Sequence, residues 1–152
     1  MGHTLKQHLV QENVLDFFVL ETELQYLAFI AIKKIGNREF SLVFTTSKRV
    51  YDRLCSDGIA CDLINKSSHG WLGRLVRIRS NLVLYKKRVE ELDCTFSDII
   101  LHFPRIDNIH NNIVINYLRH HFQEAKVSVR LIPDGAINIF SSNLSAAKIE
   151  KQ

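Results

Sequence analysis

The chain has 152 residues, of which 46% are hydrophobic and 24% are charged, and its formal net charge is +4. This length and composition are typical of one globular domain with a sizeable core, and they exclude an intrinsically disordered chain. The positive excess is too small for a dedicated nucleic-acid-binding protein, so we expect no nucleic-acid partner.

Apolar runs alternate with amphipathic segments along most of the chain. We expect residues 1–12 to be a flexible N-terminus, residues 13–140 to be one Rossmann-like domain, and residues 141–152 to begin a linker or helix. The expected strands cover residues 13–20, 39–46, 60–64, 96–103 and 126–132, and the expected helices cover residues 23–34, 48–56, 71–92 and 109–123. Alternating strands and helices with short connections indicate parallel strands joined by right-handed crossovers. The predicted fold class is α/β, a three-layer Rossmann-like domain with a mostly parallel five-stranded sheet.

The first strand and helix have the clearest local signals. The run NVLDFFVL is nearly continuous in apolar residues, as expected of a strand covered on both faces. Thr22 is the expected N-cap of the following helix, and Gln25 completes a capping box three residues later. Gly36 is a suitable stop for that helix.

The segment 71–92 is predicted to be one long or broken amphipathic helix with a basic outer face. Its cationic residues are Arg74, Arg77, Arg79, Lys86, Lys87 and Arg88. Two interpretations remain open: the basic face is simply solvated, or it contacts an anionic acceptor or the surface of the inner membrane.

The cysteines and the lack of long apolar stretches indicate the cellular compartment in which the protein is expected. Cys55, Cys61 and Cys94 form no C-x-x-C pair and are odd in number, which favours a reducing compartment. The N-terminal sequence lacks the apolar core of a signal peptide, and no stretch approaches the roughly 18 apolar residues that span a bilayer. We therefore expect a cytoplasmic protein.

Several common catalytic and cofactor motifs are missing. The turn after the first strand reads ETELQ rather than a glycine-rich loop, so we expect no dinucleotide or Walker-type site and no cofactor. The histidines lack the spacing of a zinc site, and the adjacent His120 and His121 cannot share one helix face, so we expect no metal. No G-x-S-x-G elbow of a serine hydrolase is present.

The turn Pro133-Asp134-Gly135 follows the last predicted strand within the stretch 127–140. It has two interpretations. Pro, Asp and Gly form a good turn without any function, whereas a carboxylate at the carboxyl end of a strand lies where open α/β sheets place catalytic groups. The other acids at predicted strand ends are Glu21, Glu23 and Asp107, and positive charge for a phosphate or an acidic acceptor is available from Arg105, Arg130 and His102.

Two segments suggest a family. The opening VLDFFVLETELQYLAFIAI resembles the N-terminal strand–turn–helix of bacterial sialyltransferases and polysialyltransferases, which build capsules and lipooligosaccharides. The sequence LIPDG at 131–135 resembles the acidic-acidic-Gly motif that carries the general base in that family. Two positions depart from the pattern: Glu23 stands where Pro is common, and Pro133 stands where the family has the first acid, the one expected to act as base.

The resemblance implies the acceptor-side half of a GT-B glycosyltransferase. Such an enzyme transfers a sugar, with sialic acid as one candidate, from a nucleotide donor to a glycan or glycolipid acceptor. By resemblance Asp134 would activate the acceptor hydroxyl, and Glu23, Gln25, Arg105 and Gly135 would bind substrate. GT-B enzymes bind the donor with a second Rossmann-like domain, so the resemblance also implies a truncated or split enzyme. The alternative is a non-catalytic, flavodoxin-like binding or interaction module in which Asp134 is only a turn residue.

Overall fold

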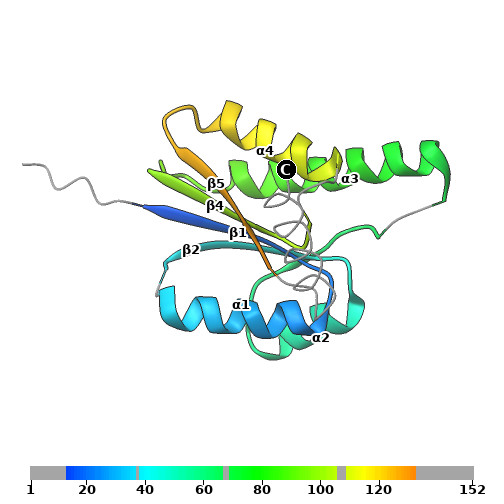
Figure 1. The fold of residues 1–152 in the computed structure, drawn as a ribbon, viewed down its shortest axis with the longest axis horizontal. Helices are drawn as coiled ribbons and strands as arrows, with labels where there is room; N and C mark the ends of the chain where they lie inside the picture. Colours follow the sequence, from blue (N-terminus) through cyan, green and yellow to red (C-terminus); the bar gives the residue numbers. More distant parts are fainter. Residues whose placement is uncertain (1–12, 37, 67–68, 106–108, 133–152) are drawn as a thin grey trace, which may run out of the picture.

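The computed structural model describes residues 13–36, 38–66, 69–105 and 109–132 of the chain. These residues form one parallel sheet between two layers of helices (Figure 1). The strands are β1 (Val14–Leu20), β2 (Phe40–Thr45), β3 (Asp62–Leu63), β4 (Asp98–Phe103) and β5 (Lys126–Leu131). The helices are α1 (Glu23–Gly36), α2 (Lys48–Ser56), α3 (Gly70–Glu90) and α4 (Ile109–His121). The predicted α/β class with a five-stranded parallel sheet is confirmed.

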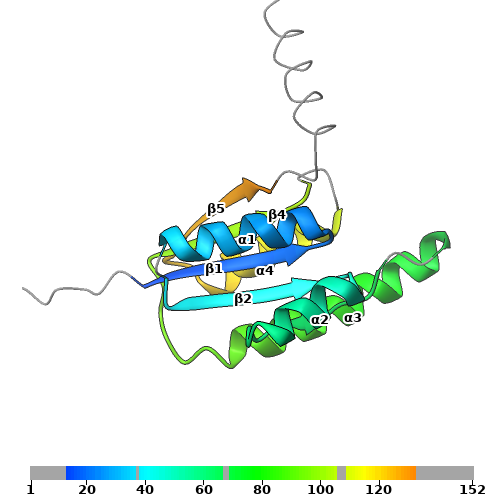
Figure 2. The same cartoon turned by 90° about the horizontal axis from the view of Figure 1, so that it is seen from below.

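Strand β1 is the centre of the sheet because its side chains are buried on both faces. Leu15, Phe17 and Val19 pack on the side covered by α3 and α4, whereas Phe18 and Leu20 pack on the side covered by α1 and α2 (Figures 1 and 2). This two-sided burial explains why the run is nearly continuous in apolar residues.

The strand order is β3-β2-β1-β4-β5, with every neighbouring pair parallel. The chain first builds outward from β1 to β3 and then returns through α3 to place β4 on the other side of β1. This is the order of the classic doubly wound dinucleotide-binding folds, and it differs from the 2-1-3-4-5 order of flavodoxin. The topological switch point, where ligands bind in such sheets, lies between β1 and β4.

The predicted capping box at the start of α1 is present. The backbone N–H of Gln25 donates to the Thr22 hydroxyl at 3.4 Å, and the Gln25 side-chain oxygen accepts from the backbone N–H groups of Glu21 and Thr22 at 2.6 and 3.3 Å. The helix continues through Gly36, two residues beyond the predicted end.

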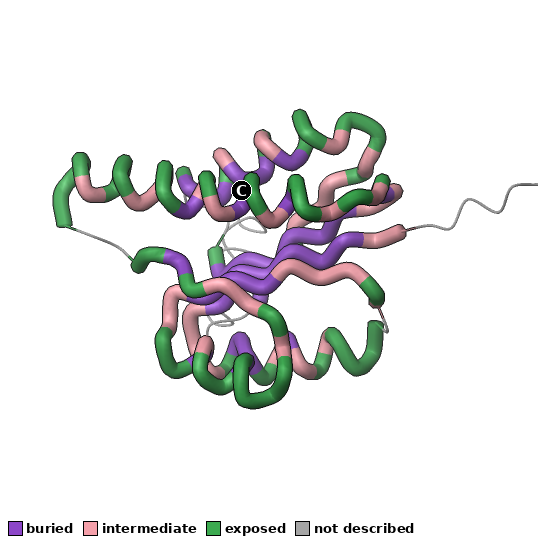
Figure 3. Tube along the Cα trace, turned by 180° about the vertical axis from the view of Figure 1, so that it is seen from behind, coloured by how far each residue is buried: buried purple, intermediate pink, exposed green. Residues whose placement is uncertain are grey.

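The segment predicted to be one long or broken helix forms a single continuous helix, α3. Its C-terminal half is attached to the sheet edge: Arg88 donates to both carboxylate oxygens of Asp62 at 2.7 Å, and the buried Asn81 side chain bonds the backbone N–H and C=O of Asn65 at 3.0 and 3.2 Å. Its N-terminal half extends beyond the sheet and is mostly exposed (Figure 3).

Candidate functional site

A small cleft opens at the carboxyl edge of the sheet, at the switch point between β1 and β4. It has a volume of about 40 Å³. Its lining comes from the segments that follow the strands and from the two helices on one face of the sheet. The lining residues are Val19, Glu21, Thr46, Ile64, Asn65, Arg77, Asn81, Pro104, Arg105, His110 and Asn111.

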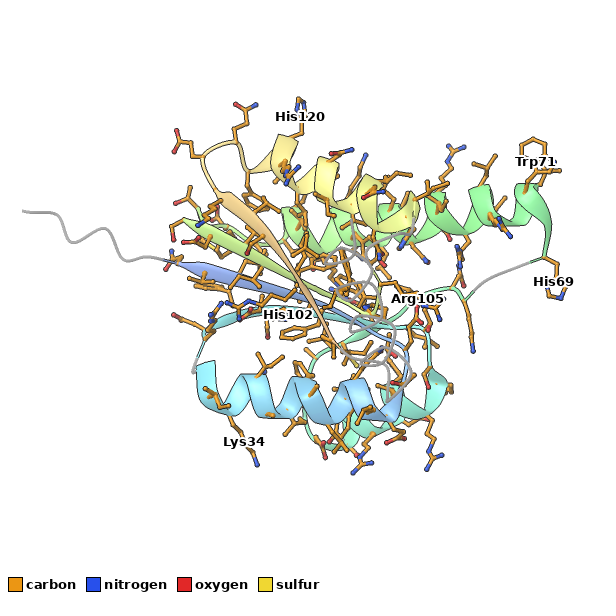
Figure 4. The ribbon with its side chains drawn as sticks, viewed as in Figure 1. Lys34, His69, Trp71, His102, Arg105 and His120 are labelled. Atoms are coloured by element: carbon orange, nitrogen blue, oxygen red, sulfur yellow. The ribbon has the colours of Figure 1, made fainter. Side chains whose placement is uncertain are left out.

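The chain places charged groups in this cleft because parallel strands end at the same edge. Glu21 directly follows β1, and Arg105 follows β4 (Figure 4). The backbone carbonyl of Arg105 accepts a hydrogen bond from the Asn111 side chain, which ties the loop after β4 to the first turn of α4. Arg77 enters from α3. The cleft therefore combines two guanidinium groups with one carboxylate.

The Arg77 side chain is half-buried, and its Nε is buried without a hydrogen-bond partner among the described residues. Beneath it lies Tyr85, which is fully buried. Burial raises the pKa of the Tyr85 hydroxyl well above its usual value; Arg77 acts in the opposite direction and Glu21 in the same direction. The phenol is therefore a neutral hydroxyl at physiological pH, and the positive charge in this part of the cleft belongs to the arginines.

His110 lies in the first turn of α4 and is buried. Burial and then the Arg77 guanidinium hold its pKa below the usual value, while a hydrogen bond with Asn111 acts in the opposite direction. His110 is therefore neutral at physiological pH. The cleft keeps its positive charge on Arg77 and Arg105, with the positive end of the α4 dipole beside them.

The lowered pKa of His110 predicts that the protein loses stability on acidification. The unfolded chain takes up a proton at this histidine as the pH falls through about 6.5, before the folded chain does, so this part of the stability is present above that pH and declines below it. We expect His110→Gln to reduce the drop in melting temperature between neutral and mildly acidic pH. The control is His120→Gln at the exposed end of α4 (Figure 4). Equal pH dependence in the two variants would contradict the assignment.

The residues predicted to bind substrate fall in different places. Arg105 lines the cleft. Glu23 does not; its carboxylate pairs with Arg49 at 3.0 Å and with Arg53 at 2.8 Å, which joins α1 to α2. Gln25 is fully buried and serves the capping box at the start of α1. The predicted catalytic Asp134, together with Gly135, lies outside the described residues, as does Asp107.

Two other positively charged candidates, His102 and Arg130, belong to the opposite face of the sheet. His102 is buried, stacks on Phe18 with ring centroids 4.1 Å apart, and bonds the Asp16 carboxylate at 2.8 Å (Figure 4). Arg130 is its register partner on β5 and is exposed. Since side chains of register partners point the same way, Arg130 faces away from the cleft.

Sequence reasoning missed several lining residues, above all Arg77 on α3 and the pair His110 and Asn111 on α4. The helical pattern predicts that Arg77 belongs to a basic outer face, whereas in the structure it lines the cleft. His110 and Asn111 could have been found from their position in the first turn of a helix that follows a strand. Backbone N–H groups and side chains of such a turn lie at the carboxyl edge of the sheet, where ligands bind.

Within the described ranges, no group of three or more His, Cys, Asp or Glu side chains is positioned to hold a metal ion. None of the helices in those ranges combines the length and apolar character needed to cross a bilayer. Comparison with models of protein families, with curated proteins and with solved structures found no match to this chain.

Proposed function

We propose that this chain is the acceptor-side domain of a nucleotide-sugar-dependent glycosyltransferase that acts on an anionic glycan or glycolipid in bacterial surface-polysaccharide or lipooligosaccharide synthesis. The observation that supports this most is the cleft at the β1–β4 switch point, which combines the guanidinium groups of Arg77 and Arg105 with the carboxylate of Glu21. The resemblance of the segments 14–32 and 131–135 to sialyltransferases supplies the reaction type.

The size of the cleft favours one charged group of a larger ligand. Its volume of about 40 Å³ corresponds to roughly three water-sized probes. A carboxylate or a phosphate group fits this scale, and the remainder of the ligand would lie outside on the open side. Guanidinium groups form strong, charge-assisted hydrogen bonds with such oxyanions, and the N-terminus of α4 adds a favourable dipole.

A transfer reaction also needs a general base. In the proposed step, the acceptor hydroxyl oxygen forms a bond to the anomeric carbon of the donor sugar, while the bond from that carbon to the nucleotide breaks and the nucleotide phosphate keeps the electron pair. The hydroxyl proton passes to a carboxylate. The family resemblance assigns this role to Asp134. Among the described residues Glu21 is the cleft's carboxylate, and we propose it as the second candidate base.

A non-catalytic binding module is the alternative, and the small volume of the cleft favours it. A site of about 40 Å³ binds a small anion without needing room for a reacting sugar. In that case Arg77 and Arg105 would recognise the anion, and Glu21 and Asp134 would have no part in chemistry.

Titration calorimetry with sialyllactose, lactose and cytidine monophosphate separates the two functions. The acceptor-side proposal predicts that sialyllactose binds and that lactose, which lacks the carboxylate, binds at least about tenfold more weakly. Binding of cytidine monophosphate in the absence of binding to either sugar would contradict the acceptor-side proposal and support the alternative, a module that recognises a small anion such as a phosphate group.

A further inference from the structure

Helix α3 carries a second unusual surface, separate from the cleft. Four large apolar side chains, Leu72, Leu75, Val76 and Val83, are 62%, 53%, 68% and 62% exposed. Their spacing places them on one face of the helix, which we call the α3 stripe. The stripe lies away from the buried residues of the same helix, Asn81, Tyr85 and Val89, so it is not part of the core. At the N-terminal tip of the helix, Trp71 is 69% exposed (Figure 4).

The position of the stripe makes it accessible to a flat partner. The N-terminal half of α3 extends past the sheet and past the neighbouring helices (Figures 1 and 3). No other element of the described residues covers the α3 stripe. Its apolar side chains therefore make no contribution to packing α3 onto the sheet. A contiguous exposed apolar surface of this kind marks an interaction site.

Charge indicates which partner fits. Between Leu63 and Val89 the sequence contains seven Lys or Arg residues and no Asp or Glu. Because the net charge of the whole chain is only +4, the rest of the chain is net negative. Arg88 is paired with Asp62 and Glu91, and Arg77 lines the cleft. The other five cations of this segment concentrate positive charge around α3. Arg79 lies within the stripe itself, where a long side chain can extend from an apolar surface to charged groups. Two copies of this surface would repel each other, which disfavours self-association through it.

We propose that the α3 stripe docks on an anionic lipid bilayer, with the helix lying in the plane of the interface. Leu72, Leu75, Val76 and Val83 would enter the boundary between headgroups and acyl chains, and Trp71 would anchor the tip. Arg79 and the exposed Lys87, which lies four residues after Val83, would pair with lipid phosphates. This docking does not depend on the chemistry of the cleft, which uses Arg77 and Asn81 from another face of the same helix.

Sedimentation with lipid vesicles tests the proposal. We expect the full chain to bind vesicles of mixed phosphatidylcholine and phosphatidylglycerol, to bind pure phosphatidylcholine at least about tenfold more weakly, and to be released by high salt. The double variant Leu72→Gln/Val76→Gln should weaken binding to the anionic vesicles by at least about tenfold. Arg79→Gln should weaken it about fivefold, as expected for one basic residue near the surface.

Matched controls come from α1, on the opposite face of the sheet. Ile35→Gln removes an apolar side chain that is 86% exposed, and Lys34→Gln removes an exposed cation (Figure 4). Both should leave vesicle binding unchanged. All substituted residues are exposed, and thermal unfolding of each variant checks that the fold is intact.

Three results would overturn the proposal. The first is the absence of binding to anionic vesicles, which would leave an acidic protein as the alternative partner. The second is binding that the stripe variants reduce no more than the α1 variants do. The third is a concentration-dependent dimer that the double variant abolishes, because the stripe would then be a contact between copies of this chain.

Discussion

Replacing Asp16 with alanine is expected to lower the free energy of unfolding by about 1–3 kcal/mol, the usual effect of leaving a buried polar group without its hydrogen-bond partner. Asp16 lies in the middle of β1, and its side chain is 6% exposed. Its carboxylate bonds Nε2 of His102 at 2.8 Å and Nη1 of Arg38 at 3.2 Å. His102 is buried and stacks on the Phe18 ring. Its Nε2 atom would therefore have no water molecule to replace the lost carboxylate.

Chemical denaturation of the wild-type protein and of Asp16→Ala measures this change. Asp52→Ala is a suitable control, because Asp52 also forms an ion pair, with Lys48 at 2.6 Å, but both side chains are more than half exposed. We expect the control to change stability by no more than about 0.5 kcal/mol. If Asp16→Ala lowered the free energy of unfolding by less than about 1 kcal/mol, the hydrogen bond between Asp16 and His102 would not be shielded from water as proposed.

Removing either cleft arginine is expected to weaken the binding of sialyllactose by about tenfold or more. A hydrogen bond to a charged group contributes roughly 1.5–3 kcal/mol, and Arg77 and Arg105 are the two guanidinium groups that line the cleft. Arg77→Gln and Arg105→Gln keep a polar side chain and remove the charge. Calorimetric titration of each variant gives the change in affinity.

Arg130→Gln is the matched control for the cleft arginines. Arg130 is also near the carboxyl end of a strand, but it is exposed on the other face of the sheet. Its removal should leave the affinity within about twofold of wild type, since only long-range attraction would change. If the Arg130 variant lost as much affinity as the cleft variants, binding would reflect net charge rather than a site.

The sequence predicted the elements well because their signals are local. The apolar run of β1, the capping box of Thr22 and Gln25, and the helical periodicity of α4 can each be read within a few residues. The ends of elements were less accurate. β3 covers only Asp62–Leu63 instead of residues 60–64, because it is an edge strand that pairs with β2 alone, at Phe44 and Thr45.

The site was harder to predict because it depends on pairing between distant segments. The order of strands decides which turns meet, and helical periodicity alone does not show which face of α3 reaches the carboxyl edge. Arg77 therefore looked like any other residue of a basic face, whereas it lines the cleft. Glu23 looked like a cleft residue because it follows β1, but α2 offers it Arg49 and Arg53 on the other side of the sheet.

The central claim is that the cleft at the β1–β4 switch point is the ligand site. The most direct test is a nuclear magnetic resonance titration of the isotope-labelled chain with sialyllactose, in which the shift of each backbone amide is followed. The claim predicts that the largest shifts occur at Glu21, Thr46, Arg105 and Asn111, which line the cleft from four separate segments. Shifts confined to the opposite face, around Glu23 and Arg53, or spread evenly over the surface, would contradict it.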